Sequence, residues 1–223
     1  MHQIIELPAF NLASEWIALL FLSILTGLLW IKVNYSRRFE LLFGAVINPR
    51  FLRQLMREEL VFSHRASIVL TVVFFLTGSV YLYEIDNIFN LSIIDSEGFS
   101  LWFNYLILLT MIYTIKVSSM QLVKLLANGD FGLEEYQYNV FLINNAAGVV
   151  LFPFVLVSAY LYKSEASGVL IAGGIVIGLF LFYRLTRGLF SAFSNRIPLF
   201  YIILYLCSLE ILPLLILFKA LQG

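Results

Sequence analysis

One carboxylate in this sequence lies where an acidic side chain is energetically expensive. Glu210 occurs in "YLCSLEILPLLILF", near the middle of an apolar run and without a charged neighbour in the sequence. A carboxylate inside a membrane costs about 2.5–3.5 kcal/mol on an insertion scale, so Glu210 is expected to face protein rather than lipid. It could hold a proton, pair with a cation or line a wet cavity, and a structural and a functional role are equally open.

Two amides lie in another apolar run. Asn144 and Asn145 stand side by side in "FLINNAAGVVLFPF", with Gly148 one helical turn later. Amides in hydrocarbon need protein or water partners. Hydrogen bonding between helices, worth about 0.6–2 kcal/mol per contact, is the commoner use, and the wall of a polar pocket is the alternative.

Two basic side chains are candidate partners for the acid. Lys116 and Arg184 are expected in the inner halves of their spans, where the simplest interpretation is that they reach toward the inner leaflet. Either could also pair with Glu210. The sequence therefore predicts an intramembrane polar pocket that faces the cytoplasm. Its residues are Glu210, Asn144, Asn145, Lys116 and Arg184.

Recognised catalytic patterns are missing from the sequence. There is no HExxH, no GxSxG and no glycine loop of the phosphate-binding type. Cys207 is the single cysteine, and His2 and His64 lie far apart, which argues against a disulfide and against cysteine or histidine metal centres. We therefore expect a protein that is not an enzyme, with no catalytic residues, no metal and no cofactor.

The elements that position these residues are predicted membrane spans. The chain is 61% hydrophobic and 13% charged, against about 25% charged in soluble domains. Its apolar runs have about the 20 residues that a helix needs to cross a bilayer, and they lack the alternation of barrel strands. We predict an all-α polytopic membrane helix bundle that forms a single integral membrane domain over 1–223. Its six spans are expected at about 14–34, 66–83, 101–122, 139–162, 168–187 and 198–218.

The basic residues predict an orientation. Twelve of the 14 lysines and arginines lie on one side of these spans, and such residues mark the cytoplasmic side. We expect a multi-pass protein of the bacterial inner (cytoplasmic) membrane with both termini in the periplasm. The connection "EIDNIFNLSIIDSEGFS", which begins at Glu84, is acidic and free of basic residues, and it is expected to form an external loop, with a location partly in the membrane interface left open.

A cytoplasmic amphipathic segment is predicted at 48–64. Asn48 and Pro49 are typical of a helix start, and apolar residues then recur at helical spacing. Arg50, Arg53 and Arg57 occupy the other side. Such a helix can lie on the inner leaflet, where arginines contact anionic lipid, or pack on the base of the bundle, and both interpretations stay open.

Small residues and prolines complete the candidate features. Gly148, Gly174 and Gly178 are predicted helix-packing residues, because small side chains let membrane helices approach closely. Pro153 and Pro213 are predicted to kink the fourth and sixth spans, because proline removes a backbone donor and frees a carbonyl one turn earlier.

The stretch "EEYQYNVFLINNAAGVVLFPFVL" resembles the signature region of an inner-membrane protein family of Bacteroidota that is filed as a domain of unknown function. The resemblance covers most of the chain from the first span onward. It implies a protein of six-helix type with an asparagine-bearing fourth span, and no reaction. The positions that fit are Tyr138, Asn139, Asn144, Gly148 and Pro153, and Glu210 and Pro213 in the last span also look similar.

Two main functional hypotheses follow. The first is a non-catalytic multi-pass subunit or accessory protein that packs against other membrane components. The alternative is a small transporter or ligand-binding membrane protein that uses the polar pocket around Glu210. An intramembrane enzyme acting on lipid is a third hypothesis, for which the sequence offers no catalytic base. The expected surroundings are the lipid bilayer, with other membrane proteins or a second copy as partners left open, and no nucleic acid.

Overall fold

A computed structural model of the chain describes residues 15–47, 65–91, 94, 96–126 and 133–194. Over these ranges the chain is helical and contains no strand. The all-α prediction is therefore confirmed. The elements are α1 (Glu15–Asn34), α2 (Ser36–Ile47), α4 (Arg65–Phe89), α5 (Gly98–Leu126), α6 (Leu133–Tyr160) and α7 (Lys163–Ser194).

Five of these helices, α1, α4, α5, α6 and α7, are long and apolar enough to cross a membrane. Large apolar side chains such as Leu19, Met111 and Phe182 are exposed on the outside of the bundle. Water-soluble proteins keep such surfaces small, whereas lipid covers them without cost. The chain is thus a multi-pass membrane protein. The predicted sixth span, 198–218, and the predicted amphipathic segment, 48–64, lie outside the described residues.

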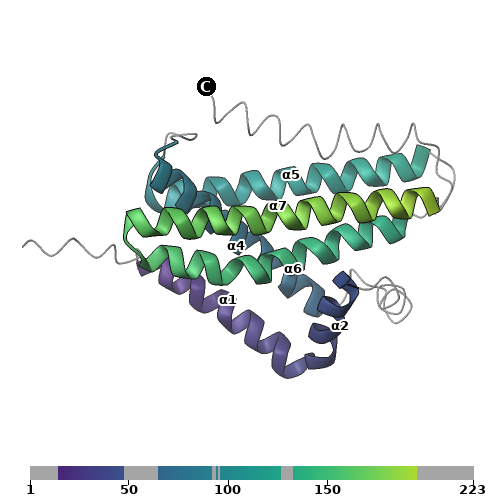
Figure 1. Cartoon of the computed structure of the whole chain (residues 1–223), viewed down its shortest axis with the longest axis horizontal. Helices are drawn as coiled ribbons and strands as arrows, with labels where there is room; N and C mark the ends of the chain where they lie inside the picture. Colours follow the sequence, from purple (N-terminus) through teal and green to yellow (C-terminus); the bar gives the residue numbers. More distant parts are fainter. Residues whose placement is uncertain (1–14, 48–64, 92–93, 95, 127–132, 195–223) are drawn as a thin grey trace, which may run out of the picture.

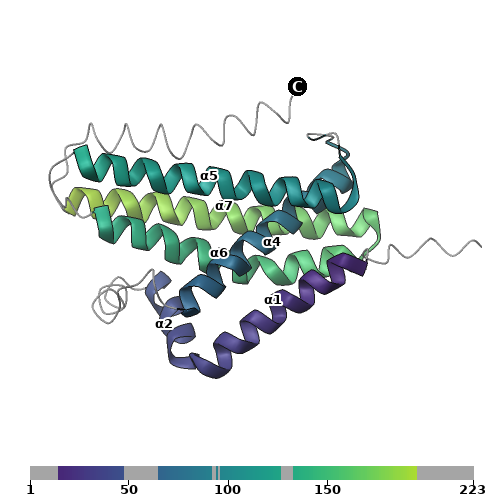
Figure 2. The same cartoon turned by 180° about the vertical axis from the view of Figure 1, so that it is seen from behind.

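Helix α4 is the central element of the bundle. It packs against α1, α5, α6 and α7, and Figures 1 and 2 show it running obliquely between α1 and the pair α6 and α7. Successive long helices run in opposite directions in both views. Helices α4 and α6 form the buried centre, because 44% and 50% of their spanning windows are buried, against 22% for α1 and 17% for α5 and for α7.

The two ends of the bundle differ in charge. The end where α4 and α6 begin is called the basic end, and the end where α1, α5 and α7 begin is called the acidic end (Figure 1). The basic end carries Lys32, Arg37, Arg38, Arg65, Lys116, Lys124, Arg184 and Arg187 against Glu40, Glu134 and Glu135, and the acidic end carries Glu15, Glu84, Asp86, Glu97 and Glu165 against Lys163.

An aromatic cluster marks the acidic end. Trp16 of α1 contacts Tyr83 of α4 with ring centroids 5.2 Å apart, and it also contacts Phe99 and Trp102 of α5 at 5.7 Å. Tryptophan and tyrosine are enriched where a membrane meets water, because their rings are apolar and their tips are polar. The cluster supports a membrane boundary at this level of the bundle.

Helix α4 continues beyond the predicted end of the second span. The predicted start of the external loop at Glu84 was wrong, because the chain stays helical to Phe89 and buries both Glu84 and Asp86. The helix ends where Asn90 takes a left-handed backbone conformation, with φ of 50°, and the Leu91 N–H donates to the Asp86 carbonyl at 3.3 Å. This is the hydrogen bond of a Schellman C-cap, for which asparagine is suited after glycine.

Candidate functional site

Arg184 and Asn144 meet inside the bundle near the basic end. Arg184 of α7 is 8% exposed, and its Nη1 donates to Oδ1 of Asn144 of α6 at 3.0 Å. Tyr113 of α5 lies near enough to Arg184 to interact with it electrostatically. A hydrogen bond to a charged group contributes about 1.5–3 kcal/mol. The structure therefore brings together two of the five predicted pocket residues and uses them to join α6 to α7.

Asn145 lies on a different face of α6, because consecutive helical residues point about 100° apart. Its side chain is 1% exposed, and its Nδ2 makes no hydrogen bond with any described residue. Oδ1 of Asn139, one to two turns earlier, is likewise buried without a partner in the described part of the chain. Each such atom costs about 1–3 kcal/mol unless a polar partner reaches it.

Lys116 is the other charged residue of the predicted pocket that the structure describes. Lys116 is half-buried on α5, three residues after Tyr113. Glu210 lies outside the described residues, together with Pro213 and the three arginines at positions 50, 53 and 57. A pocket formed by all five residues therefore stays a prediction.

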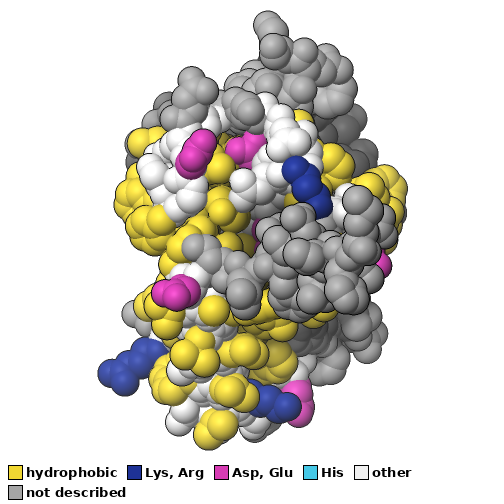
Figure 3. Space-filling model, turned by 90° about the vertical axis from the view of Figure 1, so that its left-hand side faces the viewer, with side chains coloured by type: hydrophobic (Ala, Val, Ile, Leu, Met, Phe, Trp, Pro, Cys, Tyr) yellow, Lys and Arg dark blue, Asp and Glu magenta, His cyan; other side chains and the backbone are white. Residues whose placement is uncertain are grey.

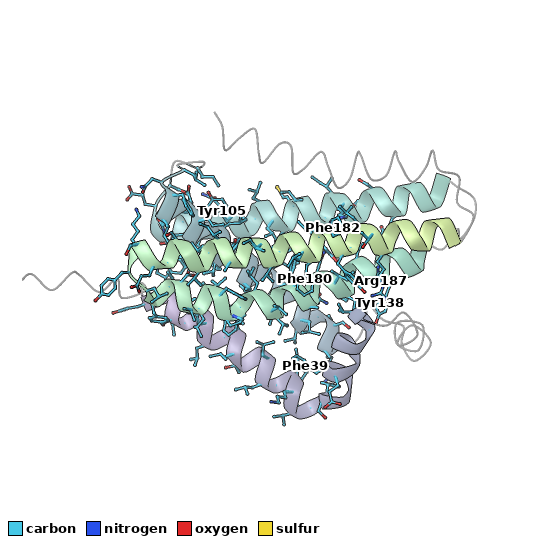
Figure 4. All side chains as sticks on the ribbon, in the orientation of Figure 1. Phe39, Tyr105, Tyr138, Phe180, Phe182 and Arg187 are labelled. Carbon is cyan, nitrogen blue, oxygen red and sulfur yellow. The ribbon has the colours of Figure 1, made fainter. Side chains whose placement is uncertain are left out.

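Arg187 ties α2 to the base of the bundle. Its Nη1 donates to the carbonyls of Ala45 at 2.9 Å and of Val46 at 2.7 Å, and the Tyr183 hydroxyl also donates to Val46 O. Figure 4 shows Arg187 and Tyr138 beside α2 at this end, whereas Tyr105 lies at the other. The last carbonyls of a helix have no partner within the helix, so a cation there satisfies them and interacts well with the helix dipole.

Replacing Arg187 with alanine is expected to release α2 from the bundle. The loss of charged hydrogen bonds worth about 1.5–3 kcal/mol should raise amide hydrogen exchange throughout Ser36–Ile47 while α1 stays protected. The exposed Arg65, at the same end, supplies the control variant Arg65→Ala. Equal protection of α2 in both variants would contradict the prediction.

The comparison with known proteins gives a family but no function. Residues 17–221 match the family described as "Domain of unknown function (DUF4271)". The chain belongs to this family. No curated protein and no solved structure matches it. The match confirms the resemblance to a domain of unknown function.

A second group of buried polar side chains, which was not predicted from the sequence, lies at the acidic end of the DUF4271 chain. Glu84 and Asp86 are each 6% exposed. The Ser158 hydroxyl of α6 lies in hydrogen-bond contact with Glu84 Oε2, and Asp86 faces Tyr105 of α5. The sequence did contain a signal for this: Ile85, Ile88 and Phe89 recur at helical spacing, which predicts that the helix continues past the two acids as far as Asn90.

Two hydrogen bonds between neutral groups join α4 to α5 and to α7 close to these acids. Trp102 Nε1 of α5 donates to Ser79 Oγ of α4 at 3.0 Å, and the Tyr81 hydroxyl donates to Leu170 O of α7 at 2.9 Å. Ser79 is fully buried. These contacts satisfy polar atoms that would be costly to leave unpaired in hydrocarbon, and they fix α4 against α5 and α7.

The candidate packing glycines differ in their surroundings. A Cβ at Gly148 would lie 2.7 Å from Phe74 Cα, and a Cβ at Gly174 would lie 2.9 Å from Tyr81 Oη. A Cβ at Gly178 would meet nothing within 4 Å among the described residues. Gly148 thus stands where α4 and α6 approach closely, Gly174 leaves room for the Tyr81 hydroxyl, and Gly178 faces outward. Pro153 is exposed, and α6 continues through it.

Proposed function

We propose that this protein is a non-catalytic multi-pass subunit or accessory protein of the bacterial inner membrane that packs against another membrane protein through α7. The observation that carries the proposal is the outer face of α7, called the α7 face. It consists of Ile171, Ile175, Gly178, Leu179 and Phe182, and its four large side chains are 55–66% exposed. Gly178 is a small residue among large apolar ones, which lets a second helix approach closely.

The use of the interior polar groups supports this proposal. Arg184 binds Asn144, Arg187 binds the end of α2 and Tyr81 binds a carbonyl of α7. In these contacts the polar side chains hold helices together, which is the commoner role of polar residues in membrane bundles. Under the proposed orientation the basic end, with the docked α2, faces the cytoplasm and both termini are periplasmic.

The proposal predicts a protein crosslink from the α7 face. A photoreactive residue at Ile175 or Leu179 should capture a second membrane protein in native membranes, because both side chains point outward. The matched control is Leu22 of α1, which is 62% exposed and has no glycine notch beside it in the described structure. Gly178→Leu fills the notch and should abolish the α7 crosslink without unfolding the chain.

Two results would overturn the proposal. One is capture of lipid alone from the α7 face in native membranes. The other is capture of residues 195–223 of the same chain, which would make the α7 face an internal packing surface. A crosslink that is equally strong from Leu22 would also count against a specific interface, because it would report crowding in the bilayer.

A second candidate function is a small transporter or ligand-binding protein that uses the predicted pocket around Glu210. The observation that favours it is the buried Nδ2 of Asn145 and the buried Oδ1 of Asn139, which find no hydrogen-bond partner among the described residues. A polar ligand or water would satisfy both atoms. On this hypothesis Glu210, Lys116 and Arg184 supply the charges that select the ligand.

A further inference from the structure

Glu84 is an acidic side chain enclosed by helices just beneath the acidic end. It lies in the last turns of α4, is 6% exposed, and its Oε1 has no hydrogen-bond partner among the described residues. Helix α6 ends at Tyr160, one half-turn beyond Ser158, so the carboxyl lies close to the end of the bundle and is almost fully covered by protein. Figure 3 looks onto this end, where acidic side chains lie among apolar and other polar atoms.

The two hydrogen-bond contacts of Ser158 depend on whether the Glu84 carboxyl is protonated. Its Oγ lies within hydrogen-bond distance of Glu84 Oε2 and of Val155 O, the latter at 3.0 Å. A serine hydroxyl carries one proton, so it donates to one of these two oxygens at a time. When it donates to Val155 O, the contact with Glu84 needs a proton on the carboxyl, which then donates to Ser158 Oγ. When the carboxyl is ionised, the hydroxyl turns and donates to Glu84 Oε2.

No basic side chain of the described residues neutralises Glu84. The only described cation at this end is Lys163, whose Nζ lies 3.4 Å from Asn90 Oδ1. An ionised carboxylate buried with one shared hydroxyl is costly, whereas a protonated carboxyl is a neutral donor that this site can satisfy. The other titratable side chains that α1, α4, α5, α6 and α7 bring to this end are Glu15, Tyr81, Tyr83, Asp86, Tyr105, Tyr160 and Glu165, with Glu97 just before α5.

We propose that Glu84 and Ser158 form an exchangeable proton-binding site between α4 and α6 at the acidic end. In the occupied state the carboxyl holds the proton and donates it to Ser158 Oγ, and Ser158 donates to Val155 O. On release the proton passes to water at the end of the bundle, the carboxylate stays behind, and the Ser158 hydroxyl rotates toward it. The step transfers one proton and involves no oxidant or reductant. It is independent of the α7 face.

Carbodiimide labelling tests this proposal on the full chain in native membranes. Dicyclohexylcarbodiimide enters lipid and adds to a protonated carboxyl, and peptide mass spectrometry locates the adduct. We expect labelling of Glu84 that declines as the buffer changes from mildly acidic to alkaline. A water-soluble carbodiimide should instead label the exposed Glu97 and Glu165 and spare Glu84. The matched variant Asp86→Asn should leave the labelling of Glu84 intact.

The labelling is measured on the wild-type chain, so the test does not depend on whether a variant of Glu84 folds. Labelling of Glu84 that follows pH and is unaffected by sodium supports a proton site. Protection by sodium ions at constant pH would overturn it in favour of a metal-cation site that uses the same oxygens. Absence of labelling at every pH, with Glu97 and Glu165 modified by the soluble reagent, would show that Glu84 exchanges no proton and is purely structural.

Discussion

Replacing Gly148 with alanine is expected to separate α4 from α6 and to destabilise the whole bundle. The added methyl would lie 2.7 Å from Phe74 Cα and 3.0 Å from Phe74 Cβ, so backbone rather than a flexible side chain must move. Overpacking of this kind costs about 1–3 kcal/mol, and contact with backbone places Gly148→Ala at the upper end. Valine should increase the effect.

Gly178→Ala is the matched control, because it also adds one methyl to a glycine in a spanning helix. Its Cβ would meet nothing within 4 Å among the described residues, so the variant should match the wild type or gain a few tenths of a kcal/mol. Denaturant titration of the purified protein in detergent measures both variants. Equal stabilities would show that α4 and α6 do not pack at Gly148 as closely as the structure has them.

Much of the fold could be predicted because membrane crossing imposes a simple rule on sequence. The apolar runs at 14–34, 101–122, 139–162 and 168–187 lie largely within α1, α5, α6 and α7, since a helix in lipid must satisfy its own backbone and expose apolar side chains. The rule failed at the end of α4. A charged residue was taken as the end of the span, whereas neighbouring helices keep Glu84 and Asp86 away from lipid.

The candidate site was less predictable, because contacts between helices depend on rotation and register that apolar runs do not encode. Arg184 and Asn144 were expected in the same half of the bundle, but only their burial and their 3.0 Å hydrogen bond show that they meet. Helix α2 was not singled out, and its docking depends on Arg187, which lies far away in the sequence. Ser158 gave no signal, since serine is common in membrane helices and often bonds only to its own helix.

The polar contacts suggest a division of the bundle into two levels. At the basic end, guanidinium groups join α7 to α6 and to α2. At the acidic end, a carboxyl, hydroxyls and an indole join α4 to α5, α6 and α7. Between them the core is mainly apolar, with Ile24, Val73, Val80 and Val155 fully or almost fully buried. A change at one end should therefore leave contacts at the other end intact.

Replacing Arg184 with leucine is expected to weaken the contact between α6 and α7 at the basic end. It leaves Oδ1 of the half-buried Asn144 without its donor, and it removes a guanidinium that Tyr113 also faces. Removing one partner so that a polar acceptor stays unpaired costs about 1–3 kcal/mol, whereas replacing both partners by apolar residues of the same shape is often nearly neutral. The double variant Arg184→Leu/Asn144→Leu should therefore recover most of the lost stability.

This double-mutant cycle distinguishes the two candidate functions. The stability of each variant is measured by denaturant titration of the purified protein in detergent. If the pair serves only to pack α6 on α7, the double variant should fold and keep the protein crosslink from the α7 face. If the pair belongs to a ligand site with Glu210, the folded double variant should lose ligand-dependent protection of the chain, and Glu210→Gln should do the same. Arg65→Leu controls for loss of a positive charge at this end. A double variant as unstable as Arg184→Leu alone would show that Arg184 stabilises the bundle through contacts other than Asn144.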